Sequence, residues 1–299
     1  MTGVLVLDKP AGFTSFDAVA VLRGLLGERK IGHTGTLDPM ATGVLPMLLG
    51  RATRALPLLA DRPKTYEAAF QFGRATDTLD RTGKTLCEDQ VPVSQAALLA
   101  ALPRFCGEIF QTPPMYSAVR QNGVRLYDLA RQGKEVERAP RPVTIYDFKI
   151  LSYDEKNRQG TLSLTCSGGT YVRVLIADLA AALGTHGVMT ALRRTQAAGF
   201  TLAEACTLDA LRAMPPEERL SQVLPAERLF SDLPAVFVSK AQAKRFLNGG
   251  ALELKRLSNK PAARCRVKDP DGRFLGIGAP KADSLCAVRL FLSPEEADA

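Results

Sequence analysis

The chain of 299 residues has no tryptophan, only two histidines, and six cysteines that never stand in a CxxC pair. The histidines, His33 and His186, lie far apart in the sequence. Because a structural zinc site needs closely spaced cysteine and histidine ligands, we expect no metal. The thiols are predicted to be reduced and mostly buried, as in a cytosolic protein. A GxxxxGK loop is also missing, so ATP-dependent chemistry is not indicated.

Long apolar segments are missing as well. The longest runs without a charged residue have 14 residues, whereas a membrane-spanning helix needs about 20 apolar residues. The first ten residues contain one short apolar run that ends at Asp8 and Lys9, which is not typical of a signal peptide. A hydrophobic fraction of 46% with 23% charged residues is typical of a folded protein. We therefore expect a folded cytoplasmic protein of one or two domains.

The excess of positive charge is local. The chain has 39 Lys and Arg against 31 Asp and Glu, which gives a net charge of +8. Residues 240–289 contain 12 basic and 4 acidic residues, so this stretch alone carries +8 and the remainder is balanced at 27 of each sign. Such a basic face either binds nucleic-acid phosphates or is an ordinary solvated surface.

Hydrophobic patterns predict helices and strands without regular alternation, which is typical of the α+β class. We predict loops at residues 31–43 and 215–225. A compact β-rich module is expected after Pro234, with a domain boundary between residues 232 and 233. The expected strands cover residues 3–7, 65–72, 143–151 and 161–166, and the expected helices cover residues 15–26, 95–102, 172–183 and 240–247.

One loop, GHTGTLDPMATGVL at residues 32–45, has features of a catalytic segment. Its single carboxylate, Asp38, precedes Pro39, whose ring fixes its own backbone and biases Asp38 toward an extended conformation. A rigid loop that presents one acid suits nucleophilic catalysis by a carboxylate. An Asp-Pro pair can also simply open a turn, so the pattern alone leaves both interpretations open.

This loop resembles the catalytic motif of the TruB family of tRNA pseudouridine synthases, and five further segments resemble other motifs of that family in the same order. Met40 and Arg120 stand where the family usually has leucine and lysine, and neither position is the expected nucleophile. The residues after 232 resemble a PUA domain. The five segments are LDKPAGFTS (7–15), KTYEAAFQFGRATDTLDRTG (64–83), PPMYSAVRQNGVRLYDLARQG (113–133), CSGGTYVRVLIADL (166–179) and LRRTQAAGF (192–200).

The resemblance implies an isomerase with a mixed, mainly antiparallel sheet flanked by helices and a small PUA-like domain. It would convert uridine 55 in the TΨC loop of tRNA to pseudouridine by cutting the C–N bond, turning the base and forming a C–C bond. No cofactor and no metal would be required. The uridine must be flipped out, because a stacked base is out of reach of an active site. Attack of the aspartate on C6 of the base and attack on C1′ of the ribose both stay open.

The resemblance also gives roles to individual residues. Asp38 would be the nucleophile and Arg173 its cationic partner, since a guanidinium stays charged and can hold a carboxylate. Tyr66 would be the platform under the flipped base, although by its pattern it is equally a core aromatic beside Phe70 and Phe72. The other implied site residues are Tyr171 and Leu192 as walls of the base pocket, His33 in the space that the uridine vacates, and Lys9 and Pro10 as supports of the catalytic loop, with Lys9 close to RNA phosphate.

The expected partner is the T-arm of tRNA, held by the insertion at residues 113–133 and by the basic tail, and the enzyme would act as a monomer without guide RNA. Two other interpretations stay open. The chain could be a guide-RNA-dependent synthase, which shares this core and a PUA domain, or a non-catalytic protein that binds or folds tRNA. The presence of Asp38, Tyr66 and Arg173 argues against the non-catalytic protein.

Overall fold

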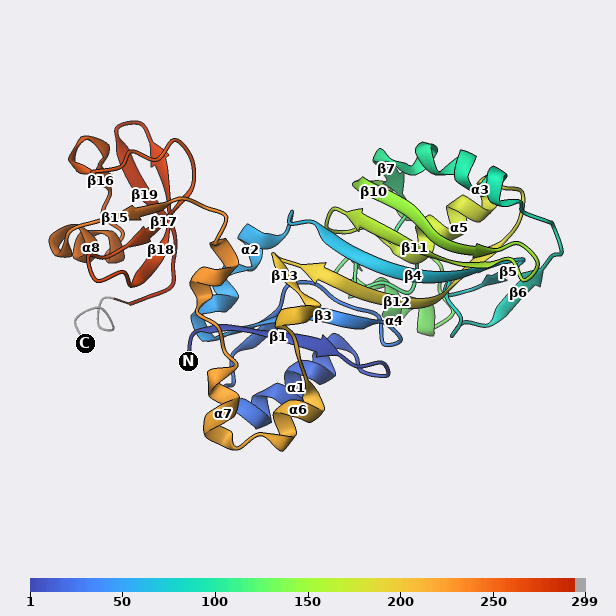
Figure 1. Ribbon diagram of the computed structural model, residues 1–299, viewed down its shortest axis with the longest axis horizontal. Helices are drawn as coiled ribbons and strands as arrows, with labels where there is room; N and C mark the ends of the chain where they lie inside the picture. The colour runs from blue at the N-terminus through green and yellow to red at the C-terminus, as the bar shows by residue number, and fades with distance from the viewer. Residues whose placement is uncertain (294–299) are drawn as a thin grey trace.

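The computed structural model describes residues 1–293 of the chain. A ten-stranded sheet forms the larger part, in the order β14-β1-β3-β12-β4-β11-β10-β7, with β2 paired to β3 and β13 to β12 (Figure 1). The β1–β14 and β3–β12 pairs are parallel and the others are antiparallel. The predicted α+β class with a mixed, mainly antiparallel sheet is thus confirmed. The strands are β1 (Gly3–Lys9), β2 (Ile31–His33), β3 (Thr42–Leu49), β4 (Lys64–Phe72), β7 (Gly107–Gln111), β10 (Arg141–Asp154), β11 (Gln159–Cys166), β12 (Gly187–Ala197), β13 (Phe200–Thr201) and β14 (Cys206–Thr207).

The helices lie around this sheet, and α1, α6 and α7 gather beside β1 (Figure 1). The predicted helix at residues 15–26 is present as α1, which begins at a Thr14 capping box and ends at Gly27 in the left-handed conformation. No helix within the described residues is long and apolar enough to cross a membrane. The helices are α1 (Ser15–Leu26), α2 (Leu56–Leu59), α3 (Gln95–Ala101), α4 (Leu126–Arg131), α5 (Val172–Ala182), α6 (Leu208–Ala213), α7 (Pro216–Ser221) and α8 (Lys240–Leu247), with 3-10 turns η1 (Gly50–Ala55), η2 (Leu102–Phe105), η3 (Leu202–Glu204), η4 (Ala226–Phe230) and η5 (Leu254–Arg256).

Strand β4 lies at the centre of the sheet and carries the alternation that the sequence predicts. Tyr66, Ala68, Phe70 and Phe72 are all buried on one face, because successive side chains of a strand point to opposite faces. Helix α5 adds apolar side chains to the same core, among them Leu175. The main core therefore lies between β4 and α5. The predicted site residue Arg173 lies in the first turn of α5.

Four details of the sequence interpretation are wrong. Phe16 has the helical spacing of Val19, Leu22 and Leu26, which predicts one apolar face, but it is 67% exposed. The predicted loop at 31–43 begins with strand β2, because Ile31–His33 pairs with β3. The predicted linker at 215–225 contains α7, since a proline in the first turn is compatible with a helix start. Cysteines are also less buried than expected, with two buried, two intermediate and two exposed.

Two short ribbons lie outside the main sheet. One of them lies in the insertion at residues 113–133, which also contains α4. Most side chains of this insertion from Arg120 onward are exposed. The other ribbon follows β4 and forms the loop that carries Asp80. The ribbon strands are β5 (Arg74–Thr76) with β6 (Thr85–Glu88), and β8 (Arg120–Gln121) with β9 (Val124–Arg125).

The basic tail folds as a small β module with its own core around Phe246, Val267 and Leu285. Its helix α8 occupies the predicted range, and Ser239 caps it. The curled five-stranded sheet has the order β15-β17-β18-β19-β16 and is PUA-like, as predicted. Its strands are β15 (Ala235–Phe237), β16 (Leu252–Glu253), β17 (Cys265–Lys268), β18 (Phe274–Lys281) and β19 (Ser284–Leu290).

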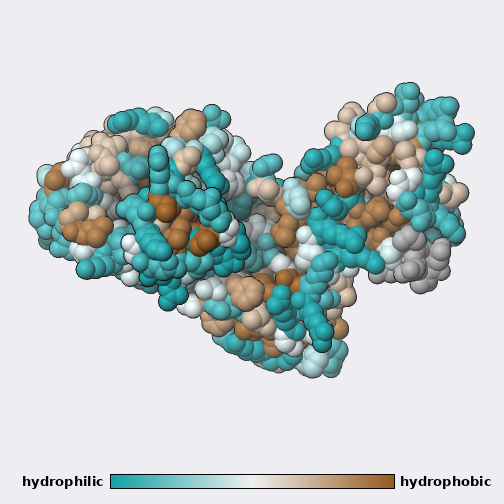
Figure 2. All heavy atoms as spheres, turned by 180° about the vertical axis from the view of Figure 1, so that it is seen from behind, coloured by the Kyte–Doolittle hydropathy of each residue, from teal (hydrophilic) through white to brown (hydrophobic). Residues whose placement is uncertain are grey.

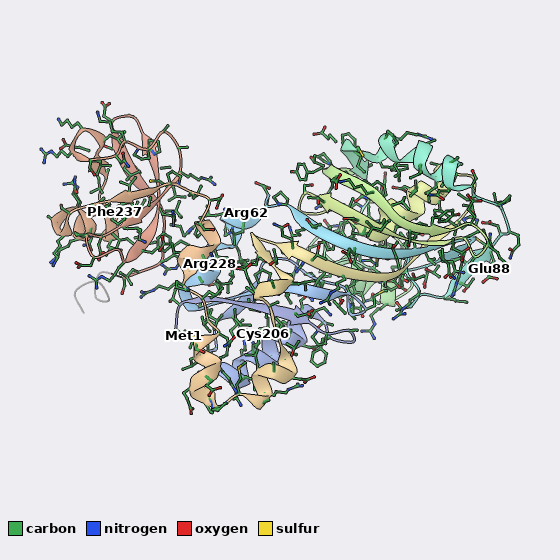
Figure 3. All side chains as sticks on the ribbon, in the orientation of Figure 1. Met1, Arg62, Glu88, Cys206, Arg228 and Phe237 are labelled. Atoms are coloured by element: carbon green, nitrogen blue, oxygen red, sulfur yellow. The ribbon has the colours of Figure 1, made fainter. Side chains whose placement is uncertain are left out.

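The module is docked on the larger part through a shared hydrophobic cluster. The Phe230 ring of η4 packs against Phe274 and Phe291, at centroid distances of 6.2 and 5.5 Å. Arg266 of the module pairs with Glu227 of η4 at 2.7 Å, and Arg62, which Figure 3 labels, lies beside this junction. Seen from behind, the two lobes are separated by a notch with hydrophobic residues near its base (Figure 2). The docking therefore combines an apolar contact with charged contacts around it.

Candidate active site

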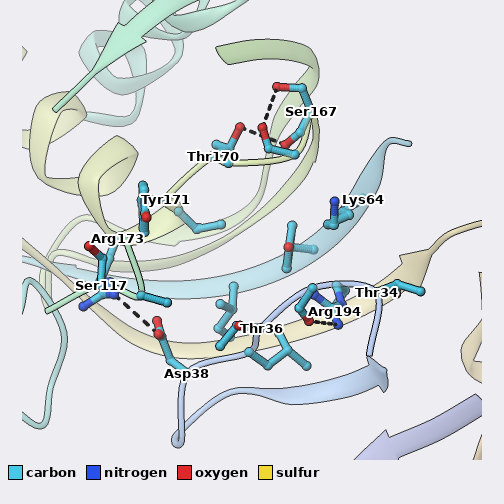
Figure 4. A pocket seen from close by; sticks show the side chains of 18 of the residues that line it. Thr34, Thr36, Asp38, Lys64, Ser117, Ser167, Thr170, Tyr171, Arg173 and Arg194 are labelled. Carbon is cyan, nitrogen blue, oxygen red and sulfur yellow. Dashed lines mark hydrogen bonds and ion pairs between the residues drawn. The ribbon is translucent and has the colours of Figure 1, made fainter. Parts of the chain in front are cut away.

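A cavity of about 600 Å³ opens between the 34–38 loop, strands β4 and β12, and the start of α5. Five of the eight site residues predicted from the sequence line it, and Figure 4 labels three of them. Those five residues are Asp38, Tyr66, Tyr171, Arg173 and Leu192. Side chains that are distant in the sequence are therefore brought to one cavity.

The loop that carries Asp38 is fixed at several points. The Ala41 amide donates to the Asp38 carbonyl at 3.0 Å, and the Gly12 amide donates to the Pro39 carbonyl at 2.8 Å. The Ser15 hydroxyl, at the start of α1, accepts from the Leu37 amide at 2.9 Å. Contacts from outside the loop therefore hold both residues next to Asp38, which suits a group that must be presented in one geometry.

Arg173 contacts Asp38 from the first turn of α5. Its Nη2 lies 3.4 Å from Asp38 Oδ1 and donates to the Tyr116 carbonyl at 2.6 Å, while Nη1 donates to the Thr78 carbonyl at 3.2 Å. Arg173 is 4% exposed, so these contacts hold it in place. The pair expected from the sequence is therefore present, and the two carbonyls orient the guanidinium independently of Asp38.

The Asp38 carboxyl has a perturbed pKa. Burial raises this pKa above the ordinary value of 3.8, and the charge of Asp80 raises it further, while Arg173 and Lys9 oppose the rise. The side chain keeps 32% of its surface exposed, toward the cavity. A weakly hydrated carboxylate that faces a cavity beside one arginine is a typical arrangement for a reactive acid.

Aromatic and aliphatic side chains form the walls around this carboxylate. Tyr66 on β4 is 7% exposed, and burial raises the pKa of its hydroxyl above 10. Leu192 on β12 is 8% exposed. The Tyr171 ring lies 5.9 Å from the Arg173 guanidinium carbon, in the range of cation–π contacts. Together these side chains form a slot with apolar walls beside the Asp38–Arg173 pair, suited to a flat ring.

Lys9, Pro10 and His33 do not line this cavity. Lys9 is fully buried, and its Nζ donates to the carbonyls of Pro10, Phe13 and Pro39 at 2.8, 2.7 and 3.4 Å. An ammonium enclosed by three carbonyls does not favour direct contact with RNA, and the predicted closeness of Lys9 to RNA phosphate stays a prediction. The contact with Pro39 does match the predicted support of the catalytic loop. Burial lowers the pKa of Lys9 to about 8.

Pro10 lines a second, smaller cavity of about 360 Å³, together with Lys9 and Arg193. His33 lies half-buried on β2, and its Nδ1 has no hydrogen-bond partner. Burial and the charge of Arg194 lower the pKa of His33, which favours the neutral ring. Its expected position in the space vacated by a flipped uridine stays a prediction.

Sequence reasoning missed several polar residues of the cavity, among them Lys64, Arg194 and Ser117. Lys64 lies at the start of β4, Arg194 lies on β12 and is 1% exposed, and Ser117 belongs to the insertion. Lys64 and Arg194 each stand two positions from a predicted site residue, Tyr66 and Leu192, so strand alternation could have found them. Within the described residues, no cluster of three or more histidine, cysteine or acidic side chains could hold a metal ion.

Comparisons with known proteins point to one family. Residues 23–172 match the N-terminal domain of the TruB family pseudouridylate synthases, and residues 173–231 and 234–291 match two TruB C-terminal domains. A protein of Pseudomonas fluorescens named tRNA pseudouridine synthase B is 43% identical over 99% of this chain and 97% of its own length. The protein of that name from Burkholderia mallei is 43% identical over 98% of each chain.

Solved structures show the same fold. A chain of a Cbf5–Nop10–Gar1 complex has a TM-score of 0.74 at 24% identity, over 99% of this chain and 86% of that one. A chain of the archaeal box H/ACA Nop10–Cbf5 complex has a TM-score of 0.73 at 24% identity, over 99% and 88%. With family models over both parts of the chain and relatives that match nearly its full length, this chain belongs to the TruB family of pseudouridylate synthases.

Proposed function

We propose that the chain isomerises uridine 55 in the TΨC loop of tRNA to pseudouridine, with Asp38 as the nucleophile. The observation that carries this proposal is the Arg173–Asp38 contact of 3.4 Å at the edge of a slot walled by Tyr66, Tyr171 and Leu192. The reaction moves the glycosidic link of one uracil from N1 to C5. The C–N bond breaks, a C–C bond forms, C5 loses a proton and N1 gains one, so no external reactant is consumed.

Asp38 acts as an anion, and Arg173 supports that anion. Because burial disfavours the charge, the carboxylate is less stabilised than one in water and is more reactive toward an electrophilic carbon. The guanidinium limits this penalty, and its two carbonyl contacts keep it in place throughout the reaction. Both attack on C6 and attack on C1′ use the same carboxylate in the same position.

The aromatic walls compensate for unstacking of the target base. Flipping a base costs a few kcal/mol, and stacking on an aromatic side chain returns about 1–3 kcal/mol per base. Tyr66 is suited to this because its hydroxyl stays protonated at neutral pH, which leaves a neutral ring face. Tyr171 and Leu192 confine the base while it turns in the slot.

The insertion and the C-terminal module hold the rest of the tRNA. We place the domain boundary between residues 232 and 233, just before β15. Of the twelve basic residues in 240–289, Arg266 and Lys268 pair with Glu227 at the junction, and basic residues of α8 such as Lys244 are exposed to solvent. Phosphate contacts of this kind make binding weaken as salt increases.

We further propose that the chain works as a cytoplasmic monomer without guide RNA. Relatives that are 43% identical carry the name tRNA pseudouridine synthase B, whereas the Cbf5 chains, solved in complexes with Nop10, are 24% identical. The exposed insertion also gives the chain a means of its own to hold an RNA stem-loop.

The test is incubation of the purified chain with unmodified tRNA or an isolated T-arm hairpin, followed by mapping of pseudouridine. We expect conversion at uridine 55 without guide RNA and none with the Asp38→Asn variant. Tight binding without product from the wild-type chain would instead indicate a non-catalytic tRNA-binding protein. A product that requires added guide RNA would contradict stand-alone action.

A further inference from the structure

The cavity has two ends of different chemistry. Asp38, Arg173 and Tyr171 lie at one end, and Lys64, Thr34 and Arg194 lie at the other (Figure 4). The first end carries an acid that faces an arginine, so its charges nearly cancel. The proposed reaction uses this first end and Tyr66. It gives the residues of the second end no role.

Two positive charges meet at the second end without a carboxylate bound to either. Lys64 Nζ makes one long hydrogen bond, of 3.4 Å, to the Arg62 carbonyl. Arg194 donates from Nε to the Val44 carbonyl at 2.7 Å and from Nη2 to the Gly35 carbonyl at 3.1 Å. Among residues 1–293, no carboxylate oxygen lies within ion-pair distance of Lys64 or Arg194. Burial and the charge of Arg194 lower the pKa of Lys64, and the charge of Asp61, which also lines the cavity, opposes this shift although Asp61 forms no ion pair with Lys64.

Unpartnered polar atoms accompany these charges. Arg194 is 1% exposed, and its Nη1 has no hydrogen-bond partner. The Thr34 hydroxyl is also buried without a partner and lines the same end of the cavity. Because buried donors without acceptors cost about 1–3 kcal/mol each, this concentration of unpaired donors indicates a place that a ligand completes.

Two glycines leave room for the Lys64 side chain. A Cβ atom at Gly35 would lie 3.3 Å from Lys64 Cε. A Cβ atom at Gly168 would lie 3.4 Å from Lys64 Nζ and would clash with the Ala60 carbonyl. The ammonium is thus held between the Asp38 loop and the β11–α5 loop, at the cavity wall rather than free in solvent.

We propose that this second end is a phosphate subsite, in which Lys64 binds a phosphodiester next to the flipped uridine and Arg194 supplies fixed positive charge from beneath. An ammonium and a guanidinium without counter-ions suit a phosphate, which carries a full charge and only acceptor oxygens. The inference rests on the proposed function, because a base at Asp38 brings its own phosphodiester linkages into the same cavity. Lys64 thereby fixes how deeply the nucleotide enters.

The test uses T-arm hairpins that carry one neutral methylphosphonate linkage, either 5′ or 3′ of the target uridine. We expect one of the two positions to lower kcat/KM of the wild-type chain about tenfold, as for loss of one charge-assisted hydrogen bond. The Lys64→Met variant should show the same loss with the normal hairpin and no further loss with the modified one. The slope of log affinity against log salt should fall by about one for this variant, and Lys64→Arg should restore most of the activity.

Lys149→Met is the matched control, since Lys149 is exposed on β10 and pairs with Asp147 at 2.8 Å. It should respond to the methylphosphonate as the wild-type chain does. An equal response of wild-type and Lys64→Met chains at both linkages would overturn the subsite while leaving the proposed function intact. If the wild-type chain forms no pseudouridine, the proposed function fails, and the affinities of the same hairpins for the wild-type and Lys64→Met chains decide the subsite.

Discussion

Removal of either charge from the Asp38–Arg173 pair should abolish product, but the two changes should alter the stability of the protein in opposite directions. The reason lies in what each variant leaves behind. Arg173 has two carbonyl partners besides Asp38, whereas Asp38 has Arg173 as its nearest cation, in a site where burial already raises its pKa.

In Asp38→Asn, the buried negative charge disappears and the guanidinium keeps the carbonyls of Thr78 and Tyr116, at 3.2 and 2.6 Å. A carboxyl whose pKa is raised in the folded chain destabilises that chain at pH 7, because the fold disfavours the ionised form that is present there. We therefore expect Asp38→Asn to gain about 0.5–2 kcal/mol in the free energy of unfolding, as is common when a functional group is removed.

In Arg173→Met, the carboxylate loses its cation and both carbonyls lose their donor. Breaking one side of a buried ion pair costs about 3–5 kcal/mol, out of a total stability of about 5–15 kcal/mol. This variant should still fold. Its deficit should shrink as the pH falls, because protonation of Asp38 removes the uncompensated charge.

The assay is thermal unfolding of the wild-type chain and both variants between pH 5 and pH 8, with hairpin binding and pseudouridine mapping on the same samples. Asp38→Asn should melt a few degrees higher than the wild-type chain and bind RNA within a few-fold of it. Arg212→Met is the control, since Arg212 pairs with an exposed Asp209 at 2.8 Å and such pairs contribute about 0.2–1 kcal/mol. An Asp38→Asn variant that is less stable than the wild-type chain would refute the claim that burial of this carboxylate destabilises the fold. A variant that forms pseudouridine would refute its role as the nucleophile.

Three further predictions concern the site and its supports. Single-turnover rates should fall on the acid side with a midpoint above 3.8, because the raised pKa of Asp38 must be exceeded for ionisation; a midpoint at or below 3.8 would contradict this. Lys9→Met should lower kcat about 10–100-fold with little change in KM, because it removes the contact with the Pro39 carbonyl. A raised KM at unchanged kcat would instead indicate that Lys9 contacts RNA. A chain that ends at residue 232 should lose tRNA affinity more than turnover and melt earlier. Full-length Phe291→Ala removes the packing of this ring on Phe230 and Phe274 but keeps every basic residue of the module. If it loses as much tRNA affinity as the shortened chain, the loss comes from packing and not from the basic residues.

Local patterns predicted those parts of the fold that depend on local sequence. The helix at 15–26 carries its apolar spacing in its own residues and is flanked directly by its caps, Thr14 and Gly27, so its bounds could be predicted correctly. Strand β2 could not, because its three residues become a strand only by pairing with β3 from further along the chain. The docking of the module was also out of reach, since Phe230 and Phe291 meet only after both parts have folded.

The site shows the same division within single strands. A resemblance to a family motif identifies the loop of Asp38. Lys64 and Arg194 also lie within segments that resemble family motifs, at residues 64–83 and 192–200, but the resemblance gives neither of them a role. Each stands two residues from a named neighbour, Tyr66 or Leu192, and a period of two puts both members of each pair on one face of their strands. Since β4 and β12 are adjacent, once Tyr66 and Leu192 are assigned to the cavity, alternation alone requires that Lys64 and Arg194 face the same side. A motif indicates which segments form a site, and the strand period indicates which of their other side chains must share it.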